Sequence, residues 1–109
     1  DVGDTRFSPS ETLVRELIAQ GAFVTCHDPY IRYWNELKIS MSEQLPPSAD
    51  FNAIILAVPH HQYLDFDWPS WGSRDSLILD ASRVLAKEQR ELARTKGIRI
   101  ESIGRGNGL

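Results

Sequence analysis

Ala53-Ile54-Ile55-Leu56-Ala57-Val58 is the stretch that decides the fold, because it is apolar at every position. A strand that is apolar along its whole length suits burial on both faces, which occurs in parallel sheets covered by helices. Pro59 follows directly and ends the strand, since proline has no backbone N–H to continue the ladder of hydrogen bonds. The stretch therefore predicts one strand of a parallel sheet.

The sequence after this strand predicts two more strands and the helices between them. Leu77-Ile78-Leu79-Asp80 predicts a short buried strand, and residues 98–103 alternate as an edge strand does. Residues 60–74, rich in aromatics and proline, predict one or two short helical turns, and residues 84–96 predict a helix capped by Gly97. Strands separated by helices imply right-handed crossovers and hence a parallel sheet.

The sequence before the stretch begins with a predicted helix over residues 9–20. Ser8 is suited to cap this helix, Pro9 to occupy its first position and Glu11 to reach back as in a capping box. An apolar stripe at helical spacing follows, and Gly21 supplies the left-handed cap at the C-terminal end. The residues of the stripe are Leu13, Val14, Leu17 and Ile18.

The region between the first helix and the sheet is less regular. Residues 22–27 form a short apolar run that predicts a buried strand ended by Asp28-Pro29. Residues 39–41 predict a short strand, and residues 42–45 a turn of helix stopped by Pro46-Pro47.

These elements predict an α/β fold, a three-layer Rossmann-like domain with a parallel sheet. A chain of 109 residues fits one compact domain, residues 1–109, and its 41% hydrophobic residues are enough for a core. The chain opens in a loop and goes straight into a helix, so we expect the first strand to be missing or truncated.

Composition excludes several classes of partner. The net charge of −3 and the pI of about 5.5 argue against a nucleic-acid binder, which needs a basic face. We expect no membrane segment, because no apolar run approaches the roughly 20 residues that span a bilayer, and no signal peptide is evident. The single cysteine, Cys26, rules out an internal disulfide and favours the cytoplasm.

Ligands of open α/β sheets bind beyond the carboxyl ends of the strands, which here means the loops at residues 4–10, 27–30, 59–61 and 80–83. Arg6 lies before a helix N-terminus, where a guanidinium can complete a phosphate site. The alternative is a surface ion pair of Arg6 with Asp1 or Asp4, which would contribute little.

Other polar residues favour structural roles. Asp28 is interpreted as a turn residue, because no glycine fingerprint precedes it. His60 and His61 are adjacent and cannot share one face, so we expect no metal site. Cys26 lies in an apolar run, where a thiol is normally inert. The three tryptophans are interpreted as packing or interface residues rather than base-stacking platforms; they are Trp34, Trp68 and Trp71.

Several segments resemble one known family. Residues 1–10, DVGDTRFSPS, resemble the motif that opens the C-terminal domain of the UDP-glucose/GDP-mannose dehydrogenases, with Arg6 at its arginine. Residues 21–30 resemble the family's Gly-Ala, strand and Asp-Pro segment, and residues 49–60 resemble its Ala-Asp, apolar strand and Pro-His segment. Residues 80–85, followed by Gly97 and Ile103-Gly104, resemble its last strand, helix and strand, so that the likeness covers essentially the whole chain.

The resemblance implies the UDP-sugar-binding domain of an NAD-dependent oxidoreductase of polysaccharide biosynthesis, which oxidises the C6 alcohol of a nucleotide sugar to a uronic acid. It further implies that the catalytic cysteine, its helper lysine and the glycine-rich NAD loop lie in the rest of the dehydrogenase chain, and that the full-length enzyme forms a homo-oligomer. No catalytic residue is assigned here, and Cys26 does not match the catalytic position. UDP is preferred over GDP because the UDP branch of the family is larger.

Two arginines carry the binding roles that the resemblance implies. Arg6 maps onto the family arginine that contacts the NAD phosphate. A family arginine that contacts the substrate falls at Ser82 here, with Arg83 one residue later, so Arg83 is the candidate substrate-binding residue. The alternatives are a branch that binds its substrate differently and, for the whole chain, a stand-alone nucleotide-binding or regulatory module without catalysis.

Overall fold

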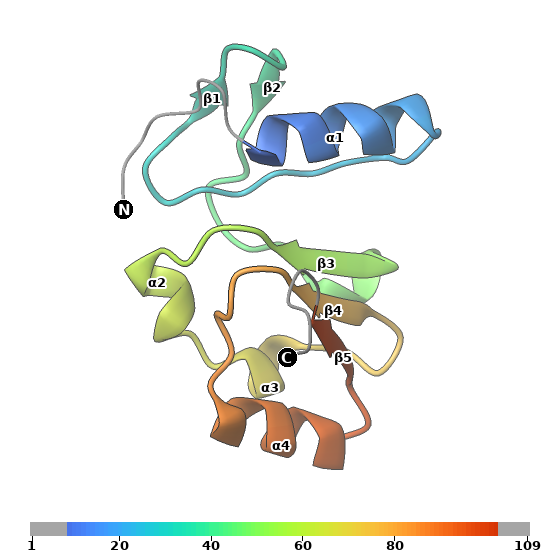
Figure 1. The fold of residues 1–109 in the computed structure, drawn as a ribbon, viewed down its shortest axis with the longest axis vertical. Coiled ribbons are helices and arrows are strands. Elements are labelled where there is room, and N and C mark those ends of the chain that lie inside the picture. The colour runs from blue at the N-terminus through green and yellow to red at the C-terminus, as the bar shows by residue number, and fades with distance from the viewer. Residues whose placement is uncertain (1–8, 103–109) are drawn as a thin grey trace. The chain divides into compact units, whose positions relative to one another are not determined.

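The computed structural model describes residues 9–102 of the chain (Figure 1). The chain divides into two compact units, Asp1–Leu45 and Pro46–Leu109. The prediction that residues 1–109 form one nucleotide-sugar-binding domain stays a prediction.

The first unit contains the predicted N-terminal helix, α1, over Pro9–Ala19. Its end is closed by Gly21, whose φ of 91° lies in the left-handed region that glycine adopts without strain. The N–H of Gly21 donates to the carbonyl of Ile18 and that of Ala22 to the carbonyl of Leu17, each at 3.0 Å. This pair of bonds is the Schellman motif, so the predicted glycine cap is confirmed. Ser8, the predicted N-terminal cap, lies outside the described residues.

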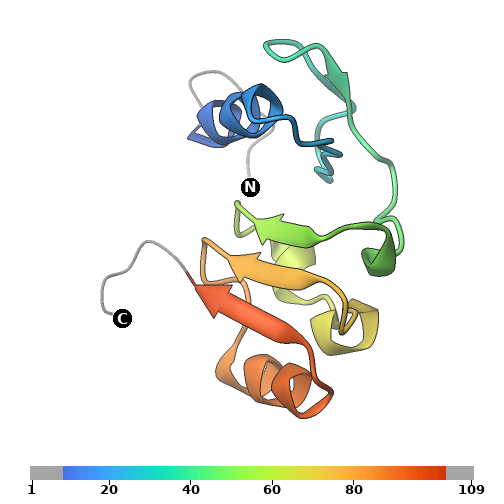
Figure 2. The same ribbon diagram turned by 90° about the vertical axis from the view of Figure 1, so that its right-hand side faces the viewer.

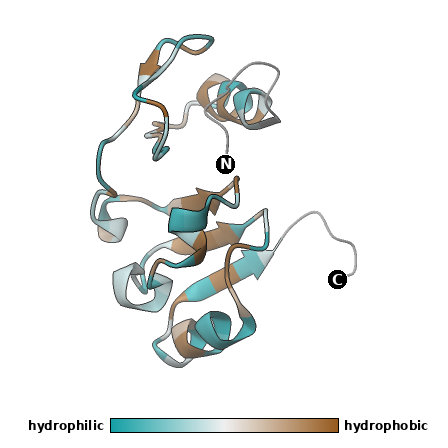
Figure 3. Ribbon diagram, turned by 90° about the vertical axis from the view of Figure 1, so that its left-hand side faces the viewer, coloured by the Kyte–Doolittle hydropathy of each residue, from teal (hydrophilic) through white to brown (hydrophobic). Residues whose placement is uncertain are grey.

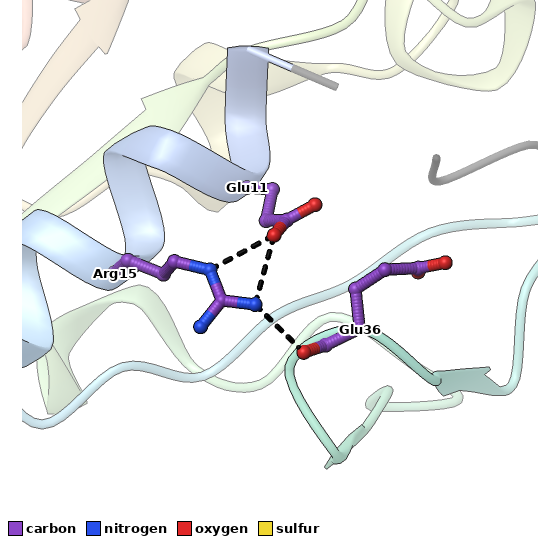
Figure 4. Close-up of polar contacts among 3 residues, drawn as sticks. All are labelled: Glu11, Arg15 and Glu36. Atoms are coloured by element: carbon purple, nitrogen blue, oxygen red, sulfur yellow. Dashed lines mark hydrogen bonds and ion pairs between the residues drawn. The ribbon is translucent and has the colours of Figure 1, made fainter. Parts of the chain in front are cut away.

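An arginine on α1 links the helix to a hairpin in the same unit (Figure 4). The hairpin pairs β1 (Tyr33–Trp34) with β2 (Ile39–Ser40) in antiparallel register. Nε of Arg15 donates to Oε2 of Glu11 at 2.8 Å, and a second guanidinium nitrogen donates to the carbonyl of Glu36, in the hairpin turn, at 2.9 Å. Glu11, whose carboxylate was expected to complete a capping box, is thus paired with Arg15, one helical turn further on.

Two predictions for the first unit are wrong. Residues 22–27 form no strand, and their one ladder contact is a bridge between His27 and Ser42. A strand needs a partner for its backbone groups, and among the described residues this run has a ladder partner only at His27; Phe23, near its start, is fully exposed. Residues 42–45 form no helical turn: Ser42 is the bridge residue and residues 43 and 44 are bends. Proline at 46 and 47 supplies no N–H and disfavours the helical conformation of the preceding residue.

The second unit contains the predicted parallel sheet (Figure 2). Its strands are β3 (Ala53–Leu56), β4 (Leu77–Asp80) and β5 (Arg99–Ser102), in the order β3-β4-β5 and all parallel. The register pairs the last residues of the three strands, since Leu56 lies opposite Asp80 and Asp80 opposite Ser102. The predicted α/β fold of Rossmann-like character is therefore confirmed.

Short helices connect the strands, as predicted for residues 60–74. They are the 3-10 turn η1 (Ser48–Asp50), α2 (His61–Leu64), α3 (Trp68–Trp71) and α4 (Lys87–Thr95). Helix α4 contacts α3 and β5. It begins three residues later than predicted, because the N–H groups of Val84 and Leu85 donate to Asp80. Gly97, at φ 85°, caps its end as expected.

The core of this unit lies between the sheet and the helices (Figure 3). Ile78 and Trp68 are almost fully buried, and the rings of Trp68 and Trp71 meet edge to face at 5.4 Å between centroids. The interpretation of the tryptophans as packing residues is confirmed for these two and for Trp34, which is buried in the first unit. The other buried apolar residues of the second unit are Leu56, Val84, Leu85, Ala93, Ile98 and Ile100.

The two edges of the sheet differ in character. Strand β5 exposes Arg99 and Glu101, and such charges normally protect an edge strand from further pairing. Strand β3 is apolar throughout, yet in the described part of the chain it pairs only with β4. The residues before α1 lie outside the described part of the chain, so the loss or truncation of a first strand stays a prediction.

Candidate nucleotide-binding site

The carboxyl edge of the parallel sheet is the candidate site, because ligands of such folds bind there. The strands end in register, so the loops after β3 and β4 leave the sheet at the same edge. These loops comprise residues 57–60 and 81–86. The segment that follows β5 lies outside the described residues.

Asp80, the last residue of β4, organises the second of these loops. Its side chain is 2% exposed, and it accepts three backbone hydrogen bonds. Oδ1 accepts from the N–H of Ser82 at 3.3 Å and of Val84 at 2.9 Å, and Oδ2 accepts from that of Leu85 at 2.9 Å. A buried carboxylate is tolerated only when its oxygens are bonded in this way, so the carboxylate and the loop stabilise each other.

Ser82 joins the same loop to the neighbouring strand. Its hydroxyl donates to the carbonyl of Ala57, directly after β3, at 2.6 Å. One residue earlier, the N–H of Ala81 donates to the carbonyl of Leu56 at 3.0 Å. The loop after β4 is therefore fixed to β3 by a backbone bond and by a side-chain bond.

Arg83 is the exposed residue between these anchors. Its φ is 56°, in the left-handed region that an arginine rarely adopts. The backbone N–H groups of its neighbours, Ser82 and Val84, both donate to Asp80. Val84 and Leu85 are buried. Ser82 is half-buried and its hydroxyl is bound to Ala57, whereas Arg83 is exposed to solvent. An exposed guanidinium at this edge can bind a phosphate oxygen by two parallel hydrogen bonds.

The two histidines of the loop after β3 lie in different surroundings. His60 is buried, with its ring centroid 5.6 Å from that of Tyr63, whereas His61 is exposed at the start of α2. Within residues 9–102, no group of three or more His, Cys, Asp or Glu side chains is placed to hold a metal ion.

The remaining sequence candidates belong to the first unit. The carboxylate of Asp28 accepts from the N–H of Tyr30 at 2.7 Å, which confirms its interpretation as a turn residue. Burial raises the pKa of the Cys26 thiol and so disfavours the thiolate, in agreement with an inert cysteine. Arg6 lies outside the described residues.

Sequence reasoning placed residues 80–83 in a ligand-binding loop but assigned no role in the site to Asp80 or Ser82. The one available signal was an aspartate at a strand end followed two residues later by serine, a pattern typical of a turn closed by a side-chain oxygen. The bond between Ser82 and Ala57 has no local signal, because it joins residues on different strands.

The comparisons with known proteins place the chain in a family. The model of the UDP-glucose/GDP-mannose dehydrogenase family, UDP binding domain, matches residues 1–87. The chain is 32% identical over 111 residues to the UDP-N-acetyl-D-mannosamine dehydrogenase of Methanocaldococcus jannaschii, across 97% of this chain and 25% of that relative. It thus spans a quarter of the length of this relative. No solved structure is significantly similar to the chain.

The chain therefore belongs to the UDP-glucose/GDP-mannose dehydrogenase family, in which it corresponds to the UDP-binding domain. Among the helices of residues 9–102, none has both the length and the apolar character needed to cross a membrane.

Proposed function

We propose that this chain binds the UDP-sugar substrate of a cytoplasmic, NAD-dependent dehydrogenase, which oxidises the C6 alcohol of the sugar to a carboxylate for polysaccharide biosynthesis. The reacting groups belong to the rest of the dehydrogenase chain, and the full-length enzyme is a homo-oligomer. The observation that carries the proposal is Arg83, an exposed guanidinium held at the carboxyl edge of the sheet.

The substrate class follows from the family and from the chemistry of the edge. The matched family model is that of a UDP-binding domain, and the relative is a dehydrogenase of a UDP-linked amino sugar. A diphosphate carries charge that one arginine fork can bind at two oxygens.

Arg6 is the one residue of this chain that we propose to contact NAD. The loops after β3 and β4 contain no glycine at residues 57–60 or 81–86, so they do not form the glycine-rich cradle of a pyrophosphate. The described residues of these loops thus do not fit a main NAD site. Substitution Arg6→Ala in the full-length enzyme should raise the KM for NAD about tenfold or more, with Arg6→Lys recovering only part.

Titration of the chain with UDP, followed by NMR, tests the proposed site. We expect binding on the order of 1 mM, because the chain supplies one part of a pocket, with shifts at the loops after β3 and β4. Arg83→Ala should weaken binding about tenfold, since a charge-assisted hydrogen bond is lost. Arg99→Ala is the matched control, because it removes the same charge from the amino end of β5. Equal effects of the two variants, or shifts confined to the amino edge, would reject the site.

The same chain should not reduce NAD with any nucleotide sugar. Its one cysteine has a raised pKa, which is opposite to the lowered pKa that activates a cysteine nucleophile. Turnover above background by the purified chain would overturn the division of roles proposed here.

A further inference from the structure

We propose that Asp80 and Ser82 are positioning residues that set the backbone of Arg83 for binding the UDP diphosphate. The inference rests on the proposed role of Arg83 in binding UDP. Asp80 and Ser82 then contribute to the affinity for UDP without contacting the ligand themselves.

Arg83 has a left-handed backbone conformation, with a φ of 56°. A non-glycine residue in the left-handed region is disfavoured, and it persists only where the surrounding structure determines it. Arg83 is exposed, so its side chain is not packed into a core that would enforce this conformation. The constraint must therefore come from the residues on either side.

Hydrogen bonds to Asp80 hold the residues on both sides of Arg83. On one side, the N–H of Ser82 is bound by Oδ1 of Asp80 and its hydroxyl is bound to the carbonyl of Ala57. On the other side, the N–H of Val84 is bound by the same Oδ1 at 2.9 Å. A single buried oxygen thus holds both neighbours of Arg83, and the chain between them has to bulge outward.

The anchored backbone limits the positions that the guanidinium of Arg83 can take. Fixing the backbone of a binding residue before the ligand arrives lowers the entropy lost on binding and therefore raises affinity. Because Ser82 is tied to the end of β3, the anchored Arg83 also keeps a fixed place relative to the loop after that strand. Asp80, which is buried, acts on the ligand through Arg83 and not by contact.

A double-mutant cycle separates positioning from general stability. The affinity for UDP is measured by NMR titration for the parent chain, Asp80→Asn, Arg83→Ala and the double variant. Asparagine keeps the shape but has one acceptor oxygen in place of two, so the loop loses either the bond to Leu85 or the two bonds to Ser82 and Val84. In either orientation the amide NH₂ faces a backbone N–H, which disturbs the loop that holds Arg83. We expect Asp80→Asn to weaken UDP binding about threefold to tenfold in the parent, and to have no further effect once Arg83 is alanine.

A milder variant covers the case in which Asp80→Asn fails to fold. Ser82→Ala removes only the bond to Ala57, and should weaken UDP binding about threefold in the parent and not at all in the Arg83→Ala background. Ser73→Ala is the matched control, because its hydroxyl also makes a loop hydrogen bond, accepting from the N–H of Asp75 at 3.1 Å, but ahead of β4. This control should leave UDP affinity unchanged.

The outcomes distinguish the inference from the proposed function. Loss of affinity that persists undiminished in the Arg83→Ala background would show a structural effect and overturn the inference. So would unchanged affinity in folded Asp80→Asn and Ser82→Ala, while the role of Arg83 would stand. Unchanged affinity in Arg83→Ala itself would overturn both.

Discussion

The hydroxyl of Ser76, a fully buried residue, donates to the backbone carbonyl of Ser48 at 2.8 Å. It also contacts the carbonyl of Phe51, and the hydroxyl of Ser48 in turn donates to the carbonyl of Trp71 at 2.7 Å. These bonds join η1 to the segment that leads into β4, within the second unit. Polar groups at such depth need partners, so the network holds the start of the sheet.

Replacing Ser76 by alanine should destabilise the second unit. The buried carbonyl of Ser48 would lose its donor and that of Phe51 its contact with the hydroxyl, so the free energy of unfolding should fall by about 1–3 kcal/mol. Urea unfolding followed by tryptophan fluorescence measures this change. The control is Ser70→Ala, whose hydroxyl makes an exposed bond to Asp67 at 2.8 Å and should cost no more than about 0.5 kcal/mol. A loss no greater than that of the control would contradict the role assigned to Ser76.

The two glycine caps should tolerate alanine poorly. Gly21 and Gly97 have φ angles of 91° and 85°, so Gly21→Ala and Gly97→Ala should each cost about 1–2 kcal/mol. A Cβ at Gly21 meets nothing within 4 Å, whereas at Gly97 it would lie 2.9 Å from Nε of Arg74. Because Arg74 is exposed and can move, strain should dominate at both sites.

Denaturant unfolding of the two glycine variants tests this account. Adding Arg74→Ala to Gly97→Ala should recover little stability. Lys96→Ala, one position earlier at φ −87°, is the control and should change stability by less than about 0.5 kcal/mol. If Arg74→Ala restored most of the loss, space rather than backbone strain would be the cause.

The thiol of Cys26 should react slowly with iodoacetamide. Burial raises its pKa, and the thiolate is the reactive form, so alkylation at a given pH should be slower than in the chain unfolded by guanidinium. Below the pKa, each rise of one pH unit increases the thiolate, and hence the rate, about tenfold. The rate profile of the folded chain should therefore lie at higher pH than that of the unfolded chain. Superimposable profiles would show that the thiol is not desolvated.

The parts of the fold that the sequence predicts are those with local causes. Strand β4 matches its prediction at both ends, because an apolar run is closed by an aspartate at Asp80. The caps at Gly21 and Gly97 were equally predictable, since glycine adopts the left-handed conformation that ends a helix without strain. The parallel sheet followed from the continuous apolar character of β3.

The remaining features depend on contacts between distant residues. The run at residues 22–27 has the composition of a strand, but a strand forms only against a partner. Helix α4 begins at Lys87 because the amides before it are bound by Asp80, which a helical pattern does not reveal. Nothing in the local sequence distinguishes Arg83 from Ser82 as the exposed residue, because that choice depends on the bond from Ser82 to Ala57.

Substituting Arg83 by glycine should separate the conformation of this residue from the chemistry of its side chain. Glycine adopts a φ of 56° without the cost that a side chain brings, which is roughly 1–2 kcal/mol. Against this gain stands the greater freedom that glycine has in the unfolded chain, about 0.5–1 kcal/mol. We therefore expect Arg83→Gly to be as stable as the parent or up to about 1.5 kcal/mol more stable. Arg83→Ala should stay close to the parent, because it keeps the strain.

Both variants should lose affinity for UDP, because both lack the guanidinium. Affinity and stability would then change in opposite directions in Arg83→Gly, as expected where a strained conformation serves binding. Urea unfolding gives the stability of each variant, and UDP titration gives its affinity for UDP. If Arg83→Gly were less stable than Arg83→Ala, the left-handed conformation would not be a source of strain. If Arg83→Gly bound UDP as tightly as the parent, the guanidinium would have no part in the site.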